Sequence, residues 1–292
     1  MRYGAMNFPV KPILKELGAV SELGFDYLEL TMDPPQAHYS IIRQQKKKLL
    51  KTLDQKKMRL VCHLPSFVYT ADLTHGLREA SLNEVLKSLE VAAELGCIKA
   101  VFHPSYILGL GIFVMDQSRE YALESLDAIM EKADRLDLLL CLENLFPKTH
   151  SLVEPEDFAE IFVKFPNLKM TLDTGHAHIE DKEGKRAVKF IARFPDRIGH
   201  IHISDNLGEA DNHLPVGAGT VNFYEIVKAL KGIDYDDTIT LEVFSRDREY
   251  LKMSRNKVAA MFADLCKDQN LANRQKRSCN IKTGPSVTTL KA

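Results

Sequence analysis

The sequence predicts a single (β/α)8 TIM barrel, a closed ring of eight parallel strands surrounded by helices. Eight short apolar segments typical of strands alternate with eight longer amphipathic segments typical of helices. The spacing between the strand candidates suits βα units, and eight such units fit in about 270 residues. No change in composition divides residues 1–268 into two domains.

The strand candidates are short runs of apolar and β-branched residues. Each is followed by a helix candidate and not by a tight turn, which favours parallel pairing because parallel strands need a long crossover connection. The predicted strands span residues 2–7, 27–31, 59–63, 100–103, 138–143, 168–173, 198–204 and 238–243.

The helix candidates repeat their apolar residues at helical spacing, which predicts one face on the strands and one in water. The first starts near Pro12, where a missing N–H costs little. A Pro34–Pro35 break precedes the second. The predicted helices span residues 12–23, 40–57, 77–95, 117–136, 155–164, 183–194, 223–230 and 247–266.

The composition is typical of a soluble globular protein, with 45% hydrophobic and 27% charged residues. No apolar run approaches the ~20 residues that span a bilayer, and the first residues lack a secretory signal pattern. None of the five cysteines forms a Cys-x-x-Cys pair, and Cys62 and Cys141 lie in apolar strand candidates. We therefore expect free, packed thiols, a cytoplasmic location and no membrane partner.

Residues 269–292 differ from the rest of the chain in charge. They hold five basic residues and no acidic ones, whereas the whole chain carries a net charge of −1. The segment has little hydrophobic period, so we expect a basic, disordered C-terminal tail after a barrel domain at residues 1–268. A basic interaction arm is the alternative. The body is net negative, which argues against a duplex-DNA partner without excluding one.

The stretch at residues 200–223 concentrates side chains that can bind a divalent cation. These are His200, His202, Asp205, Asp211 and His213. Alternation along a strand places His200 and His202 on one face, with His200 one layer deeper in the barrel. A solvated polar loop is the ordinary interpretation of such a stretch taken alone.

Other predicted strands end in similar side chains. They contribute His63, His103, Glu143, Asp173 with His176 just beyond it, and Glu242. The C-terminal ends of barrel strands form one rim, where TIM barrel enzymes place their active sites. Alternation also points Glu143 and Glu242 into the barrel mouth. Each residue alone could be a loop histidine or a helix cap, but nine together favour a metal site.

The chain resembles the xylose-isomerase-like TIM barrel superfamily, which includes sugar phosphate isomerases and epimerases and endonuclease IV. The resemblance spans roughly residues 1–265. It rests on HLP, FHPS, CLEN, LDTGHAH, HIHISDN, DNHLPVGAGTVNF and LEVF, in that order.

Resemblance to the epimerases implies one divalent ion held by Glu143, Asp173, His202 and Glu242. The two glutamates would also be the catalytic acid/base pair. The segment HLPVGAGTVNF looks more like the sugar isomerase members than like the endonuclease.

Resemblance to endonuclease IV implies three zinc ions on nine ligands. One ion would lie on His63, His103 and Glu143, a second on the four epimerase-type ligands with Glu143 as a bridge, and a third on His176, Asp211 and His213. The chain departs from the endonuclease at Asn212, where that enzyme carries an Arg. Nor does it have a loop of Arg and aromatic residues that would wedge into a duplex, Val68-Tyr69 being the nearest candidate.

We therefore expect a divalent-metal-dependent sugar or sugar-phosphate isomerase or epimerase that transfers a proton through a metal-bound enediolate. An endonuclease IV-like AP endonuclease is the alternative, and a metal-binding regulatory barrel ranks third. The ligand types suit Zn²⁺, Mn²⁺ or Co²⁺, at one to three ions per chain. Lys148 and Arg246 are the rim cations expected to bind a substrate phosphate. A homo-oligomer remains possible.

Overall fold

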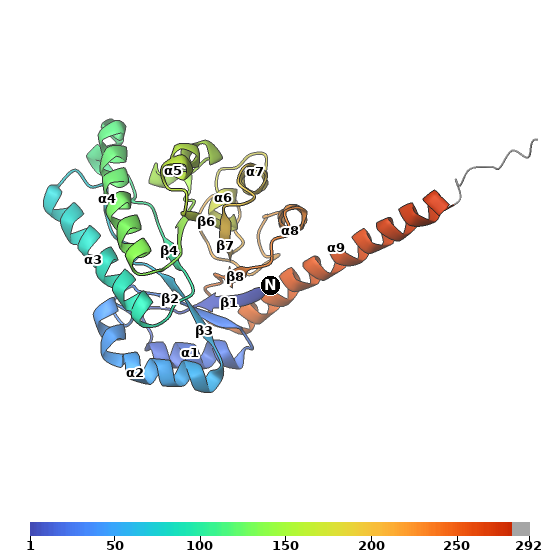
Figure 1. The fold of residues 1–292 in the computed structure, drawn as a ribbon, viewed down its shortest axis with the longest axis horizontal. Coiled ribbons are helices and arrows are strands. Elements are labelled where there is room, and N and C mark those ends of the chain that lie inside the picture. Colours follow the sequence, from blue (N-terminus) through green and yellow to red (C-terminus); the bar gives the residue numbers. More distant parts are fainter. Residues whose placement is uncertain (282–292) are drawn as a thin grey trace, which may run out of the picture.

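Eight parallel strands close into a barrel in chain order, as the computed structural model shows (Figure 1). It describes the backbone of residues 1–281 and the side chains of residues 1–265. The strands are β1 (Arg2–Met6), β2 (Tyr27–Thr31), β3 (Arg59–His63), β4 (Ala100–Phe102), β5 (Leu140–Glu143), β6 (Lys169–Asp173), β7 (Ile198–Ile203) and β8 (Thr238–Leu241). Because β1 pairs in parallel with both β2 and β8, the sheet has no free edge. The predicted (β/α)8 barrel is confirmed.

Helices follow the strands around the outside of the barrel (Figure 1). They are α1 (Ile13–Glu22), α2 (Tyr39–Lys56), α3 (His75–Glu94), η1 (Gly109–Phe113), α4 (Met115–Arg135), η2 (Pro147–Thr149), η3 (Pro155–Phe158), α5 (Ala159–Lys164), α6 (Thr174–His178), α7 (Arg186–Arg193), α8 (Phe223–Gly232) and α9 (Glu249–Ile281). The fifth predicted helix divides into η3 and α5. The short helix α6 was not predicted.

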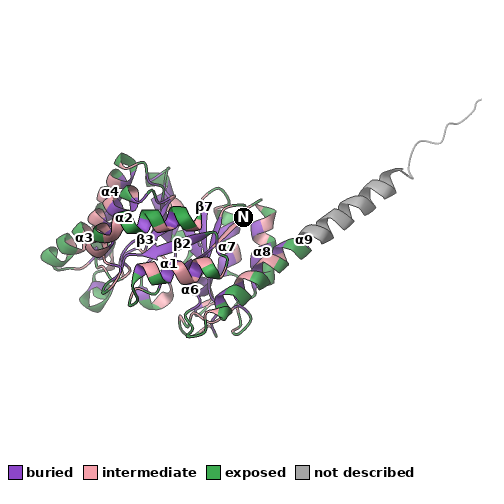
Figure 2. Ribbon diagram, turned by 90° about the horizontal axis from the view of Figure 1, so that it is seen from below, coloured by how far each residue is buried: buried purple, intermediate pink, exposed green. Residues whose placement is uncertain are grey.

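The hydrophobic core lies mainly between the strands and the inner faces of the helices, with exposed residues on the outer helix faces (Figure 2). A smaller cluster of Tyr27, Val61 and Val101 is separate from this core. Tyr27 requires glycine opposite it, because a Cβ on Gly4 would lie 2.1 Å from the tyrosine ring. The strands are therefore buried on both faces, which explains their largely apolar composition.

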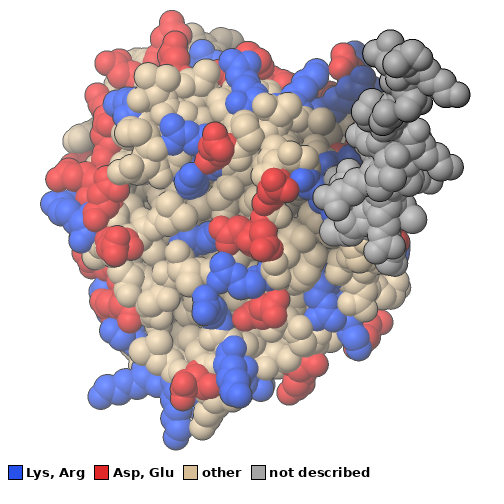
Figure 3. All heavy atoms as spheres, turned by 45° about the vertical axis from the view of Figure 1, so that its right-hand side comes forward, with Lys and Arg blue, Asp and Glu red and all other residues tan. Residues whose placement is uncertain are grey.

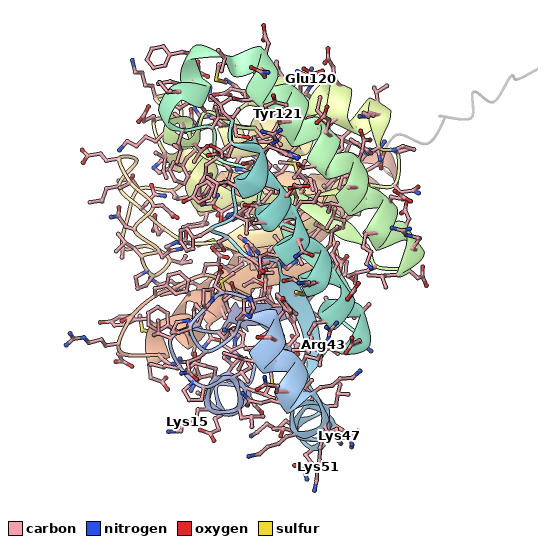
Figure 4. All side chains as sticks on the ribbon, turned by 90° about the vertical axis from the view of Figure 1, so that its left-hand side faces the viewer. Lys15, Arg43, Lys47, Lys51, Glu120 and Tyr121 are labelled. Atoms are coloured by element: carbon pink, nitrogen blue, oxygen red, sulfur yellow. The ribbon has the colours of Figure 1, made fainter. Side chains whose placement is uncertain are left out.

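Neighbouring outer helices are joined by polar contacts. Arg43 of α2 pairs with Glu94 of α3 at 2.8 Å, while Lys47 and Lys51 point away from the barrel (Figure 4). Between α3 and α4, the guanidinium of Arg78 lies 3.6 Å from the centre of the Tyr121 ring. Exposed ion pairs of this kind contribute little stability, so packing onto the strands must stabilise the barrel.

Helix α9 crosses the predicted domain boundary. Val258, Phe262 and Leu265 of this helix are buried in the core, and its backbone stays helical to Ile281. The predicted disordered tail thus begins within a helix, and residues 282–292 lie outside the described residues. The boundary at residue 268 remains a prediction. No helix in the described part of the chain is long and apolar enough to cross a bilayer.

Candidate metal centre

The nine predicted ligand residues all lie at or just beyond the C-terminal ends of barrel strands. His63, Glu143 and Asp173 end β3, β5 and β6, and His202 lies near the end of β7. The others follow in the connecting segments, at His103, His176, Asp211, His213 and Glu242. Parallel pairing brings these strand ends to one rim.

The inner part of the rim centres on His202. Its Nδ1 atom lies 3.0 Å from Glu242 Oε1, 3.4 Å from Glu143 Oε2 and 3.7 Å from Asp173 Oδ2. All four side chains are buried. A single imidazole nitrogen offers at most one proton, so it cannot satisfy three carboxylates.

Two further histidines approach Glu143. His103 Nε2 lies 3.2 Å and His63 Nε2 lies 3.5 Å from the same oxygen, Oε2. Ligand atoms of these three residues all fall within 4.8 Å of one another, as do those of Glu143, Asp173 and His202. Glu143 is therefore shared by two adjacent candidate ion positions.

The outer part of the rim centres on Asp211. Its Oδ2 atom lies 2.9 Å from His213 Nε2 and 3.3 Å from His176 Nε2. The Asp211 side chain keeps 20% of its surface exposed, whereas that of Glu143 keeps 1%. This trio therefore lies nearer to solvent than the His202 cluster.

Three of the histidines are oriented by a hydrogen bond between Nδ1 of the ring and the backbone. Nδ1 of His63, His176 and His213 hydrogen-bonds to a backbone carbonyl, at 2.7, 2.9 and 3.2 Å. That bond leaves Nε2 of each ring to face the carboxylates. Metal-ligating histidines commonly show this arrangement, because the outer bond fixes the tautomer and the ring orientation.

Asp173 also acts as a helix cap, a role that a carboxylate at a strand end can take. Its side chain accepts a hydrogen bond of 2.6 Å from the His176 N–H, so it caps α6. This cap uses Oδ1, while Oδ2 faces His202. The short helix turns His176 back towards Asp211.

Asp205 does not join the ligand cluster, although its position in the stretch at residues 200–223 made it a candidate. Its carboxylate accepts backbone N–H bonds from Gly217, Gly219 and Val221 at 2.8, 2.9 and 3.1 Å. A Cβ on Gly219 would lie 2.4 Å from Asp205 Oδ1, so the loop requires glycine there. Asp205 therefore shapes the loop that carries Asp211 and does not point at the site.

Glu29 was missed by sequence reasoning. It lies in β2 with no exposed surface, and its two oxygens contact His200 Nε2 and His202 Nε2, each at 2.9 Å. A signal was present, because an acid in the middle of the apolar run YLELT has to face the barrel interior with Tyr27 and Thr31. The expectation that His200 lies deeper than His202 agrees with its hydrogen bond to Thr238, at the start of β8.

The donor atoms fit a divalent cation. Polar atoms lie close to Glu143 and His202, at distances down to 3.0 Å, but their geometry does not make hydrogen bonds. Among the side chains of residues 1–265, both carboxylate oxygens of Glu143, Oδ2 of Asp173 and Nδ1 of His202 are left without a hydrogen bond. Unsatisfied buried charges of this kind are costly, and a cation between them would remove the cost. Mixed imidazole and carboxylate ligands suit Zn²⁺, Mn²⁺ or Co²⁺ better than Ca²⁺.

The protonation of these groups is strongly perturbed. Burial opposes ionisation of Glu143, but His103 and His202 outweigh it and hold the pKa of this carboxyl well below its usual range. Burial raises the pKa of Glu242 to about 7, and His202 offsets only part of that rise. His63 is disfavoured as a cation by burial, yet its contact with Glu143 raises its pKa to about 9.

The predicted substrate cations lie in exposed positions. Lys148 Nζ lies 3.4 Å from the backbone oxygen of Glu209, in the loop that carries Asp211. Arg246 lies in the segment after β8, two residues beyond Phe244, whose ring centre is 4.4 Å from that of His213. Arg248, another cation of that segment, is instead hydrogen-bonded to Glu16.

The fold and the rim together define a class of protein: TIM barrels with a cluster of histidines and carboxylates at the strand C-termini that could hold a metal ion. Within that class, the family model for the xylose isomerase-like TIM barrel matches residues 17–264, so the chain belongs to this family. The predicted family is confirmed.

Three relatives illustrate the family. An uncharacterized protein of Methanocaldococcus jannaschii is 28% identical over 275 residues, covering 89% of this chain and 92% of the relative. The fructoselysine 3-epimerase of Escherichia coli O157:H7 is 22% identical, covering 82% of this chain and 87% of that enzyme. The crystal structure of a D-tagatose 3-epimerase-like protein superimposes with a TM-score of 0.81 at 24% identity, covering 92% of this chain and 99% of the other. The relatives thus include sugar epimerases.

Proposed function

We propose that the protein is a divalent-metal-dependent sugar or sugar-phosphate epimerase or isomerase. One observation carries the proposal: three buried carboxylates, Glu143, Asp173 and Glu242, converge on Nδ1 of His202 within 3.7 Å. The epimerases among the relatives support the substrate class.

An ion held by these four residues would polarise a substrate carbonyl as a Lewis acid and make the adjacent C–H more acidic. Glu143 and Glu242 come from β5 and from the segment after β8, which are not neighbours in the barrel. One glutamate takes the proton from the carbon beside the carbonyl. The other returns a proton to the opposite face, so the configuration at that carbon is inverted.

The walls of the site favour this chemistry. Glu143, Asp173 and His202 are buried, so competing water would be largely excluded from the proton transfers. Tyr106 lies beside His103, with its hydroxyl 3.4 Å from Nδ1. Phe146 covers His176 at a ring-centre distance of 5.1 Å. These rings lie beside two histidines of the candidate ion positions.

A phosphate group on the substrate would be bound by Lys148 and Arg246. Both are exposed, and both lie in segments that border the outer trio of Asp211, His176 and His213. One phosphate needs only one or two cationic partners. Turnover of phosphorylated and free sugars by Lys148→Met and Arg246→Met variants would separate the two substrate types.

Phosphodiester hydrolysis is the second candidate. It is favoured by the two additional histidines on Glu143 and by the trio at Asp211, which could hold a second and a third ion. On the face drawn in Figure 3, however, Lys and Arg are interspersed with Asp and Glu. A protein that follows a DNA backbone normally gathers cations on one surface.

The direct test is a substrate panel. The purified protein is stripped with a chelator, reloaded with Mn²⁺, Co²⁺ or Zn²⁺, and incubated with ketoses and ketose phosphates, and the products are identified by NMR. We expect metal-dependent formation of an epimer or isomer. Absence of turnover across the panel, together with metal-dependent cleavage of an abasic oligonucleotide, would favour the second candidate.

A further inference from the structure

Glu29 is a carboxylate of β2 that no step of the proposed reaction uses. It is fully buried. Its Oε1 atom accepts a hydrogen bond of 2.9 Å from Nε2 of His202, whose other nitrogen, Nδ1, faces the candidate ion position. Glu29 thus contacts a ligand residue on the side away from the carboxylates.

We propose that Glu29 is a positioning residue that fixes the tautomer and ring orientation of His202. The inference rests on the proposed function in one respect, because His202 has to be a metal ligand. With the Nε2–H bonded to Glu29, the lone pair of His202 is on Nδ1, the atom that faces Glu143, Asp173 and Glu242. The opposite tautomer, with its proton on Nδ1, would present an N–H to the ion position.

Glu29 is itself held rigidly. Its second oxygen, Oε2, contacts Nε2 of His200 at 2.9 Å and accepts a hydrogen bond from Thr240. Thr240 in turn contacts the hydroxyl of Tyr27 at 2.8 Å. Since β2, β7 and β8 all contribute, the carboxylate is fixed from three strands and can define the His202 plane.

These residues could in principle form an ion site of their own, since ligand atoms of Glu29, His200 and His202 lie within 4.8 Å of one another. The hydrogen bonds favour positioning. Both Glu29 oxygens already have donors at hydrogen-bond distance. Among residues 1–265, neither carboxylate oxygen of Glu143 accepts a well-formed hydrogen bond, although His103 Nε2 lies 3.2 Å from Oε2. The cation therefore belongs beside Glu143, and Glu29 acts through His202.

The first test needs no variant. In the ¹⁵N-labelled, Zn²⁺-loaded protein, histidine ring nitrogens are observed by long-range ¹H–¹⁵N correlation, with the His202 signals assigned by their loss in His202→Gln. We expect His202 to carry its proton on Nε2 and to bind zinc through Nδ1. Zinc on Nε2, or a His202 signal unaffected by zinc, would overturn the proposal.

The second test measures Mn²⁺ affinity by calorimetry for the wild type, Glu29→Gln and Thr238→Val. Thr238→Val is the matched control, because it removes a buried hydroxyl that contacts His200 at 2.7 Å and leaves the Glu29–His202 bond in place. We expect Glu29→Gln to weaken Mn²⁺ binding about 10- to 100-fold, with affinity near wild type in Thr238→Val. Equal affinity in folded Glu29→Gln and wild type, or equal losses in both variants, would contradict positioning by Glu29.

The Mn²⁺ affinities test the positioning role of Glu29 independently of turnover. If the wild type binds Mn²⁺ and Glu29→Gln weakens binding, yet no ketose is converted, the proposed function fails and the positioning role stands. If ketoses are converted and Glu29→Gln retains wild-type Mn²⁺ affinity, the positioning role fails alone.

Discussion

Glu242 Oε1 lies 3.0 Å from Nδ1 of His202, although the two residues belong to different βα units. Burying these two ionisable side chains costs free energy, because neither is fully hydrated. The same nitrogen also approaches Glu143 and Asp173. A cation shared by these residues, as proposed above, would explain this crowding.

Replacing either glutamate should remove catalysis without unfolding the barrel. Glu143→Gln and Glu242→Gln keep the side-chain shape but cannot exchange a proton, so kcat should fall by about 10²–10⁴-fold or more. Turnover is compared with the metal content and circular dichroism of each variant. A folded, metal-loaded Glu242→Gln enzyme with near-normal kcat would exclude an acid/base role for Glu242.

Histidines outside the four-residue set of Glu143, Asp173, His202 and Glu242 report the number of catalytic ions. His63→Ala and His213→Ala should each leave measurable turnover if one ion on Glu143, Asp173, His202 and Glu242 suffices. Metal analysis of both variants should still find that ion. Losses as severe as those of the glutamate variants would mean that a multinuclear site carries out the reaction.

Metal affinity should fall on acidification. In the metal-free protein the pKa of Glu242 is raised to about 7. Below that pH the carboxyl is protonated and an ion has to displace the proton, whereas above it the carboxylate is free to bind. Mn²⁺ affinity should therefore drop as the pH falls from about 8 to about 6, by up to about tenfold per pH unit for each proton released.

Glu242→Gln is the matched control for this titration. The variant should bind Mn²⁺ more weakly at high pH but with a shallower pH dependence, because one titrating group is gone. Identical slopes in the variant and the wild type would show that Glu242 does not take part in the proton release.

The barrel was predictable from the sequence because its signals are local and repeated. Strands such as Arg59–His63 are short apolar runs followed by amphipathic helices, and eight repeats leave few alternatives. The gathering of the nine candidate ligand residues was predictable for a related reason: strand ends lie on one rim whatever the details of packing. Side-chain alternation then gave the inward direction of Glu143 and Glu242.

The features of the site that were not predictable depend on contacts between segments that are distant along the chain. Glu29 and His202 are 173 positions apart, and no local pattern links them. Asp205 carries a ligand-type side chain, yet hydrogen bonds from Gly217 and Gly219 direct it into its own loop. Whether a carboxylate faces an ion or a backbone N–H is decided by tertiary geometry, which the spacing of residues along the chain does not reveal.

Truncation after residue 268 should leave the fold and turnover intact. Within residues 249–265, whose side chains are described, the apolar residues of α9 that pack on the barrel include Val258, Phe262 and Leu265, which precede the cut. Thermal unfolding of the full chain and of residues 1–268 is compared by calorimetry. A drop of several degrees in Tm, corresponding to about 1 kcal/mol or more in a chain of this size, would show that the removed segment stabilises the barrel.

Solvent isotope exchange tests the central claim most directly. The metal-loaded protein is incubated in D2O with the ketose it converts, and deuterium is located by NMR in product and recovered substrate. Proton transfer through Glu143 and Glu242 predicts deuterium at the carbon beside the carbonyl, dependent on the metal and absent in Glu143→Gln. Conversion without deuterium at that carbon, or equal exchange in the chelator-treated protein, would contradict metal-dependent proton transfer at this site.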